Sequence, residues 1–176
     1  MAAQRIYKQT TVFNGRATGL KNLWEPSTSY KGKPQERPNY LFAFIVPKTR
    51  GHWSEEPQFA GFTQAAQELY QQAMSHIPFP QIIWPVKDGD MSPEVGKPPI
   101  EWAKNHWLLS GSSSTPIETN IVQNGVPVKI MNRALVKPGD FVAVGIALAV
   151  NANTANAVKC YINSVLFMGP GEEIAV

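Results

Sequence analysis

The sequence predicts a mainly β protein, a small five-stranded antiparallel barrel with one α-helix after the second strand and extra loops or short strands. Fifteen prolines and thirteen glycines divide the 176 residues into short segments, which favours strands and loops over long helices. Five segments are apolar enough for main strands, and one has helical periodicity. Strands and helices do not alternate as in βαβ units, and the length fits a single domain over residues 1–176.

The first two predicted strands flank a polar loop. Gly15–Trp24 is the first strand, and Glu25–Asn39 is a proline-bearing loop that contains three cations. Tyr40–Pro47 is a run of aromatic and β-branched residues, which is typical of a strand, and its final proline cannot continue a ladder of hydrogen bonds. We therefore expect the second strand at Tyr40–Pro47.

One segment has the period of a helix. In Phe59–Met74, apolar residues recur on one face at helical spacing, and the glutamines and Glu68 fall outside that face. Pro78 and Pro80 end this helix. A proline-rich crossing follows, with one short strand around Ile82–Val86 and an Asp-Gly turn at residues 88–89.

The C-terminal half is predicted to consist of strands and turns. Strands are expected at His106–Ser113, Phe141–Val150 and Val158–Met168, and a short edge strand at Val126–Met131, where a proline removes a donor. Phe141–Val150 alternates bulky residues with alanine and glycine, so one face is core and the other is flat. The flat face admits a helix, a neighbouring strand or a ligand, and we favour helix packing or strong barrel curvature. Asn151–Ala157 joins the last two strands into a hairpin.

The first fifty residues are strongly basic. They contain nine lysine or arginine side chains and two carboxylates, a net charge of +7, whereas the rest of the chain has seven cations and eleven carboxylates. This asymmetry indicates a polyanionic partner. Aromatic residues are mixed into the same segment, and rings beside a cationic groove hold single-stranded nucleic acid without reading its sequence. The alternative is a solvated basic surface with its aromatic residues in the core.

Among small barrels, the OB-fold is the version that binds nucleic acid. Its ligand lies across strands two and three, between the loops that join strands one to two and four to five. In this chain those loops are Glu25–Asn39 and Asn151–Ala157. Charge, rings and loop position together predict these DNA-binding residues: Trp24, Tyr30, Lys31, Lys33, Arg37, Tyr40, Lys48, Arg50, Trp53, Lys104, Trp107, Lys129 and Arg133.

The core is the alternative for several of the rings. Tyr40, Phe42 and Phe44 share one strand face, which is either a stacking platform or the barrel core. We expect core for Phe42 and Phe44 and an exposed ring for Tyr40 at the strand start. Trp24 and Tyr30 have no strand or helix pattern that pulls them inward, so base stacking and rim packing both stay open.

The later candidates depend on where the chain carries them. Trp53 lies in a polar segment that we expect to be mobile, beside two cations. Trp107 fits the core as well as it fits a groove extended by Lys104. Lys129 and Arg133 contact phosphates only if their sheet edge borders the groove.

Four segments, spread over roughly residues 16–173, carry a family resemblance. They are LWEP at Leu23–Pro26, YLFAFIVPK at Tyr40–Lys48, KDGD at Lys87–Asp90 and CYINSVLFMGPGEE at Cys160–Glu173. In this order they resemble the phage single-stranded-DNA-binding proteins with an OB-fold, typified by the gene-two-point-five replication protein of short-tailed coliphages. The resemblance implies a non-enzymatic protein that binds single-stranded DNA in phage DNA replication or recombination, in the cytoplasm of the infected bacterial host.

The resemblance also bears on partners. Well-studied members of that family contact phage replication proteins through a long acidic tail, so the resemblance makes such proteins candidate partners. Glu172 and Glu173 are the only late carboxylates here, which leaves contact through a tail in doubt. We expect a monomer or weak homodimer. No apolar run approaches the roughly 18 residues that span a bilayer, and the start lacks the apolar stretch of a signal peptide, so no membrane contact is expected.

No catalytic, metal or cofactor site is expected. His52, His76 and His106 lie far apart, and no His-x-His or Cys-x-x-Cys spacing organises a metal. The serine-rich segment Ser110–Thr115 lacks the Gly-x-Ser-x-Gly elbow of a nucleophile, and no phosphate-binding glycine loop is present. The alternative function is a β-rich phage structural or assembly protein with a basic protein-binding surface, and a small nuclease ranks third.

Overall fold

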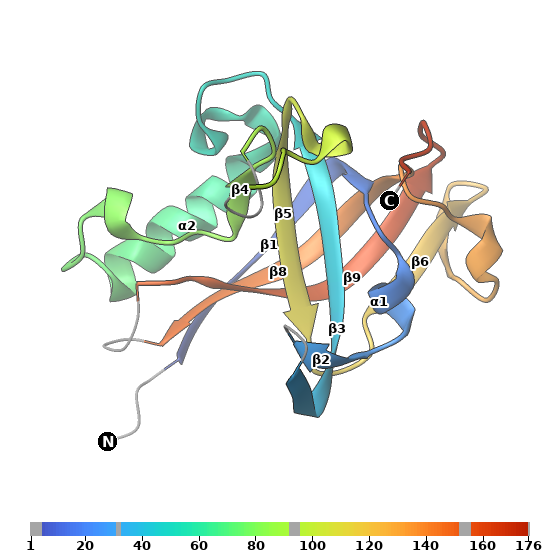
Figure 1. Ribbon diagram of the computed structural model, residues 1–176, viewed down its shortest axis with the longest axis horizontal. Coiled ribbons are helices and arrows are strands. Elements are labelled where there is room, and N and C mark those ends of the chain that lie inside the picture. Colours follow the sequence, from blue (N-terminus) through green and yellow to red (C-terminus); the bar gives the residue numbers. More distant parts are fainter. Residues whose placement is uncertain (1–4, 31–32, 92–95, 152–155, 176) are drawn as a thin grey trace.

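The computed structural model describes residues 5–30, 33–91, 96–151 and 156–175 (Figure 1). The strands are β1 (Arg5–Ala17), β2 (Ser27–Tyr30), β3 (Lys33–Pro47), β4 (Val86–Asp88), β5 (His106–Ser113), β6 (Glu118–Gln123), β7 (Val126–Lys129), β8 (Phe141–Asn151) and β9 (Lys159–Gly169). The helices are α1 (Lys21–Trp24) and α2 (Ala60–Ala73), with 3-10 turns that include η1 (Trp53–Glu55), η2 (Pro57–Phe59) and η5 (Arg133–Leu135). In these ranges no helix is long and apolar enough to cross a membrane.

Five strands close into a barrel in the order β1, β3, β5, β9, β8. Adjacent strands of the barrel are antiparallel except for β5 and β9, which close the barrel by a parallel pairing of Ser112 with Tyr161. In Figure 1, β3 and β5 cross β8 and β9 at a steep angle, as opposite walls of a small barrel do. The predicted OB-type barrel is confirmed, and α2 follows the second barrel strand as expected.

The predicted first strand, Gly15–Trp24, is wrong at both ends. Strand β1 runs from Arg5 to Ala17 because its polar N-terminal half pairs along its length with β8. Such pairing satisfies the hydrogen-bonding groups of the backbone and does not depend on the side chains. A strand with one face toward solvent therefore tolerates many polar residues. The chain then turns into α1, a single helical turn.

The predicted loop Glu25–Asn39 is a hairpin. Strand β2 pairs with the first half of β3, and Ser27 lies opposite Asn39. The second half of β3 pairs with β5 over its whole predicted length, Tyr40–Pro47. Polar strands that project beyond the core give no apolar signal, which is why this hairpin was not predicted.

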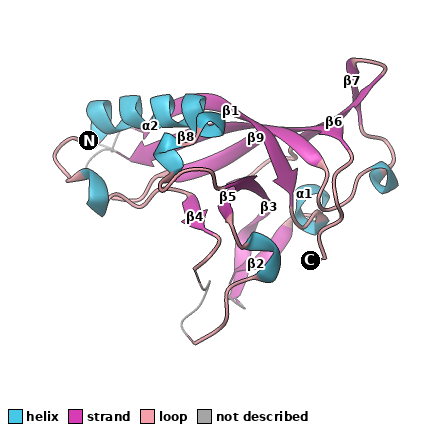
Figure 2. Ribbon diagram, turned by 90° about the horizontal axis from the view of Figure 1, so that it is seen from above, coloured by secondary structure: helices cyan, strands magenta, loops and turns pink. Residues whose placement is uncertain are grey.

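The other predicted elements lie close to their expected positions. Helix α2 and the strands β5, β8 and β9 begin and end within one residue of prediction. The short strand expected around Ile82–Val86 is β4, shifted to Val86–Asp88, where it pairs with β5. The edge strand expected at Val126–Met131 is β7. It pairs with β6, which was not predicted, and Figure 2 shows this ribbon projecting from the barrel.

Strand β8 separates bulky and small residues as predicted. Its even-numbered residues from Val142 to Val150 are 0–3% exposed and face the core. Helix α2 packs on this inner side, where a Cβ on Gly61 would stand 2.9 Å from the hydroxyl oxygen of Thr10. The small face lies on the outer side, so the expectation of helix packing on it is wrong. Barrel curvature is the better account, since the register with β9 shifts between Gly145 and Ile146.

Candidate nucleic-acid interface

Helix α1 lies between two concave surfaces. It sits in the connection from β1 to β3, which is the position of the loop between strands one and two of an OB-fold. Leu23 is 1% exposed and anchors the turn in the core. Lys21 and Asn22 line one concavity, whereas Leu23 and Trp24 line the other. One helical turn therefore contributes to both surfaces.

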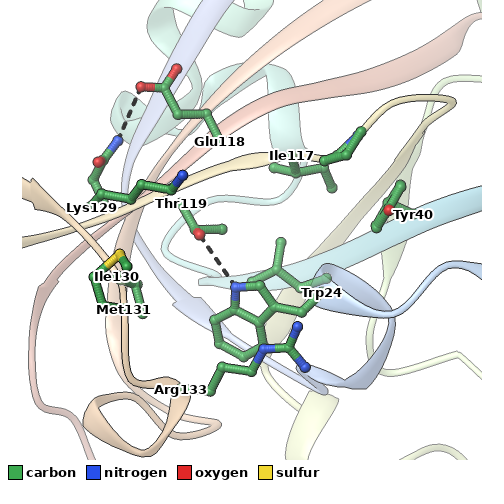
Figure 3. Close-up of a pocket in the computed structure, with 12 residues that line it drawn as sticks. Trp24, Tyr40, Ile117, Glu118, Thr119, Lys129, Ile130, Met131 and Arg133 are labelled. Atoms are coloured by element: carbon green, nitrogen blue, oxygen red, sulfur yellow. Dashed lines mark hydrogen bonds between the residues drawn. The ribbon is translucent and has the colours of Figure 1, made fainter.

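The first concavity, here called the Trp24 pocket, has a volume of about 690 Å³ (Figure 3). Four of the predicted site residues meet in it from different parts of the chain: Trp24 from α1, Tyr40 from β3, Lys129 from β7 and Arg133 from η5. The remaining lining residues are Leu23, Pro116, Ile117, Glu118, Thr119, Asn120, Ile130 and Met131. The sheet edge that carries Lys129 and Arg133 thus borders the same cavity as the two rings.

The indole of Trp24 is fixed by a hydrogen bond. Its Nε1 donates to the Oγ1 of Thr119 over 3.2 Å, and the guanidinium of Arg133 lies over the ring, 5.4 Å from the centroid (Figure 3). A nitrogen of Arg133 is 3.7 Å from a carboxylate oxygen of Glu25, and both of these side chains are more than half exposed. Exposed ion pairs of this kind are weak. The ring is therefore held in place, while the cation above it is held loosely.

Tyr40 completes the aromatic lining. It lies on the same face of β3 as Phe42 and Phe44, which are 2% and 0% exposed and belong to the core as predicted. Tyr40 itself is half-buried rather than at the open surface. Its ring lies at the end of the core, where the barrel interior gives way to the Trp24 pocket.

The second concavity, here called the sheet groove, has a volume of about 520 Å³ and lies on the outer face of β3 and β5. Leu41, which is 39% exposed, pairs with Ser112, and Ala43 pairs with Ser110. Lys21 lines the edge that α1 forms. This is the face of strands two and three on which an OB-fold holds its ligand. Its small residues leave the backbone accessible to a chain that lies across it.

Sequence reasoning missed the residues of the sheet groove. Lys21 was counted among the cations, but it was assigned to a strand instead of a helical turn. Ser110 and Ser112 alternate with Leu109, so a period of two marks them as outward-facing once Leu109 is taken as core. That signal was present in the sequence, but it does not by itself distinguish a binding face from solvent.

The β2–β3 hairpin carries another group of candidates. Tyr30 ends β2, and Lys33 and Arg37 lie in the first half of β3, where the structure describes the backbone. Lys31 lies outside the described residues. The hairpin belongs to the connection between the first two barrel strands, next to the start of the sheet groove at Leu41.

Lys48, predicted to contact DNA, is held by two carboxylates. Its Nζ donates to Asp88 and, over 2.5 Å, to Asp90, and it lies 4.6 Å from the ring centroid of Trp107. Burial alone would lower the pKa of Lys48, but the hydrogen bonds to Asp88 and Asp90 raise it above its usual range. Trp107 is 5% exposed and belongs to the core, which was the alternative for this ring.

Trp53, predicted as a DNA-binding candidate in a polar segment, is buried instead. Trp53 is 5% exposed and packs edge-on against Phe62, with ring centroids 5.3 Å apart. The turns η1 and η2 fold this segment inward, and Glu56, which is 2% exposed, accepts hydrogen bonds from Thr49 and from the backbone of Arg50. Burial alone would raise the pKa of Glu56, but these hydrogen bonds lower it below its usual range.

The remaining candidates and the cysteine lie outside both concavities. Arg50 and Lys104 line neither the Trp24 pocket nor the sheet groove, and Lys104 pairs with Glu101 over 2.8 Å. Burial raises the pKa of the Cys160 thiol to about 12, so this thiol stays protonated and unreactive. Within the described ranges, no group of three or more histidine, cysteine, aspartate or glutamate side chains could hold a metal ion.

Comparison with known proteins places the fold. Residues 12–175 match the family described as Enterobacter phage Enc34, ssDNA-binding protein. The solved single-stranded DNA-binding protein from bacteriophage Enc34, in complex with ssDNA, has a TM-score of 0.64 at 17% identity, covering 95% of this chain and 89% of that one. A structure of a C-terminal truncation of that protein has a TM-score of 0.64 at 18% identity, covering 94% of this chain and 88% of that one. The single-stranded DNA binding protein gp2.5 of bacteriophage T7 has a TM-score of 0.46 at 14% identity, covering 97% of this chain and 91% of that one. No curated protein matches the chain.

Proposed function

The chain belongs to the Enterobacter phage Enc34 ssDNA-binding protein family, and from this premise we propose that it binds single-stranded DNA without sequence preference during phage DNA replication or recombination. The membership confirms the family resemblance found in the sequence. The observation that supports the proposal most is the pair of concavities on either side of α1, at the place where an OB-fold holds its ligand. In this proposal the protein covers and protects DNA in the cytoplasm of the infected host, and it is not an enzyme.

The Trp24 pocket suits one end of a bound strand. A base stacks on the Trp24 ring after displacing the loosely held Arg133, which then turns to a phosphate. Lys129 lies in the same cavity as a second cation, and Tyr40 offers a second ring. Each base stacked on an aromatic ring contributes about 1–3 kcal/mol whatever its identity. Stacking and phosphate contact together give affinity without base readout.

The sheet groove continues the path. From the Trp24 pocket the strand passes α1, where Lys21 meets a phosphate, and lies along Leu41, Ser110 and Ser112. The hydroxyl groups of the serines are donors and acceptors for sugar and phosphate oxygens. The β2–β3 hairpin adds its candidates at the edge of this path: Tyr30, Lys31, Lys33 and Arg37.

The test is a titration of labelled oligo-dT followed by fluorescence anisotropy at several salt concentrations. Because phosphate neutralisation releases counterions, log K should fall linearly with log salt, by about 0.7 for each phosphate contact on a single strand. Three to five contacts give a slope of about −2 to −4. Duplex DNA of equal length should bind much more weakly, since its bases cannot present their faces to the rings. An affinity that salt does not change, or equal affinity for duplex, would contradict the proposal.

A further inference from the structure

Two tyrosines lie side by side on the outer face of the barrel wall formed by β1, β8 and β9. The ring centroids of Tyr7 and Tyr161 are 6.4 Å apart, and their planes are inclined by 43°. Strand alternation places both rings outside, because Ile162, next to Tyr161, is 1% exposed and points into the core. Tyr7 is 51% exposed and Tyr161 is half-buried.

The small residues of β8 leave these rings standing above the sheet. Ala149 lies opposite Tyr7, and Ala147 lies opposite Tyr161, so β8 places no bulky side chain between the two strands that carry the rings. The rings therefore face each other across an alanine floor and form a raised aromatic edge. This geometry leaves ring surface accessible to a flat ligand.

The same wall has no acidic side chain. None of the residues of β1, β8 and β9 is an aspartate or a glutamate. Lys159 is exposed and lies opposite Ala149, in the same row as Tyr7. Lys8, on the inner face of β1, is partnered by Glu68 of α2 over 3.8 Å, so its charge is already balanced. A polyanion on the outer face meets two rings and a lysine, and it meets no carboxylate of the wall itself.

This wall continues directly from the sheet groove. Ser112 lines the groove and is also the residue that pairs with Tyr161 where β5 meets β9. A strand that leaves the groove past Ser112 therefore reaches Tyr161 first and Tyr7 next. The ring separation of 6.4 Å is roughly twice the 3.4 Å axial spacing of nucleotides within a duplex strand, so it fits an extended, unstacked strand.

We propose that Tyr161 and Tyr7 form a second stacking site, with Lys159 beside the intervening phosphate, which extends the single-stranded DNA path around the barrel beyond the sheet groove. The inference rests on the proposed function. A pair of rings beside a cation suits nucleic acid more than a protein partner, because the alanines between the rings are already covered, with 1% and 6% exposed area at Ala149 and Ala147.

The test compares oligo-dT of increasing length bound to wild type and to the Tyr7→Leu/Tyr161→Leu variant, with affinities from anisotropy and folding checked by thermal melting. Long oligonucleotides should lose affinity by roughly 5- to 150-fold for each ring, which is the fold-change expected for one base stack. Short oligonucleotides that fill only the groove and the Trp24 pocket should bind both proteins equally. The length at which affinity stops rising should therefore be shorter for the variant.

Matched variants separate the explanations. Phe13→Leu removes a ring that is 58% exposed on β1 but is not part of the tyrosine pair, and it should change nothing. Lys159→Gln should flatten the salt slope for long oligonucleotides by about 0.7. A 5-iodouracil oligonucleotide should photo-crosslink to Tyr7 or Tyr161 of the wild-type protein.

The outcomes distinguish this inference from the proposed function. If wild type binds no oligonucleotide, the proposed function fails. If wild type binds and the tyrosine variant binds equally at every length, the extension is wrong and the proposed function stands. If the tyrosine variant binds oligonucleotides of every length equally more weakly than wild type, the tyrosines belong to the primary site and the proposed extension of the DNA path is wrong. A variant that changes oligomeric state without changing DNA affinity would assign the wall to contacts between copies of the chain.

Discussion

The two ends of the β3 segment that pairs with β5 carry similar side chains in different surroundings. At its start, Tyr40 shares a pocket with Trp24 and the cations Lys129 and Arg133. Just beyond its end at Pro47 come the cations Lys48 and Arg50 and the tryptophan Trp53. At the start, Trp24 is half-buried and lines a cavity. At the end, Trp53 is 5% exposed and packed among other rings. Composition is nearly the same, but one ring is available to a ligand and the other supports the fold.

The cations differ in the same way. The side chain of Lys48 is 18% exposed and contacts two carboxylates, Asp88 and Asp90, at hydrogen-bonding distance. Arg133 is 57% exposed, and among the described residues its one carboxylate partner is Glu25 at 3.7 Å. A cation whose charge is already balanced at close range gains little from a phosphate, whereas one that exchanges a weak partner for a phosphate gains more. Unbalanced charge next to an accessible ring is therefore the better mark of the interface.

The largest expected effect is at the structural end. Trp53→Ala should lower the free energy of unfolding by about 3–5 kcal/mol, because it leaves a cavity beside Phe62 and Trp84. Chemical denaturation measures the loss directly. At a temperature where the variant is still folded, its affinity for oligo-dT should equal that of wild type. Weaker binding by a folded variant would mean that this end of β3 also contacts DNA.

The second effect concerns Glu56 at the same end. Its pKa is lower in the folded than in the unfolded protein, so the folded state binds fewer protons and stability falls as the pH drops through the acidic range toward that lowered pKa. Glu56→Gln should cost about 1.5–3 kcal/mol at neutral pH, since an amide nitrogen cannot accept the hydrogen bonds of Thr49 and Arg50. The cost should shrink as the pH falls below the ordinary pKa of glutamate, about 4.3, which denaturation at several pH values would show. A cost that does not change with pH would contradict a charged Glu56.

The third effect is at the binding end. Trp24→Ala should cost about 1–3 kcal/mol of affinity for oligo-dT, the contribution of one base stacked on an aromatic ring. Melting and binding are measured on the same protein, with Trp53→Ala as the contrasting variant. If Trp24→Ala instead lowers stability by as much as Trp53→Ala and leaves affinity unchanged, the two tryptophans do not differ in role.

The strands that the sequence predicts well have one buried face. Tyr40–Pro47 and His106–Ser113 coincide with paired segments because an apolar pattern of period two records burial on one side. Strand β1 was misplaced because RIYKQTT is mostly polar, and its position depends on a partner more than a hundred residues away. Strand β6 was missed for the same reason, since it is defined by parallel pairing with β9.

The site was less predictable than the fold. Trp24 and Arg133 are brought together because the β6–β7 ribbon extends the sheet past the barrel rim, and no local pattern shows that extension. Trp53 was misjudged because its polar neighbours hide a segment that folds inward through η1 and η2. The carboxylate partners of Lys48, Asp88 and Asp90, were not predicted because they follow some forty residues later. Charge and ring content therefore predict the kind of ligand, whereas the position of each contact residue depends on the tertiary fold.

The fourth effect separates the hairpin from exposed cations elsewhere. Replacing Lys31, Lys33 and Arg37 together by glutamine should flatten the salt slope for oligo-dT by up to about 2, since each phosphate contact on a single strand contributes about 0.7. We expect stability to change little, and thermal melting of the same variant measures it. The control is Arg50→Gln/Lys104→Gln, which removes cations that line neither concavity. Equal flattening by the control would reduce the hairpin to general surface charge.

The smallest expected effect is at Glu25, the only carboxylate partner of Arg133 within the described residues. Glu25→Gln releases the guanidinium from its ion pair, so a phosphate no longer competes with a carboxylate for it, and oligo-dT should bind about 0.2–1 kcal/mol more tightly, the range of an exposed ion pair. The gain should disappear at high salt, where such pairs are screened. Glu101→Gln is the matched control, because it frees Lys104 from a similar exposed pair outside both concavities, and it should leave the affinity unchanged. If Glu25→Gln weakens binding, the carboxylate positions Arg133 for the phosphate instead of competing with it. Arg133 and Lys48 would then differ in how their carboxylate partners orient them more than in how far their charge is balanced.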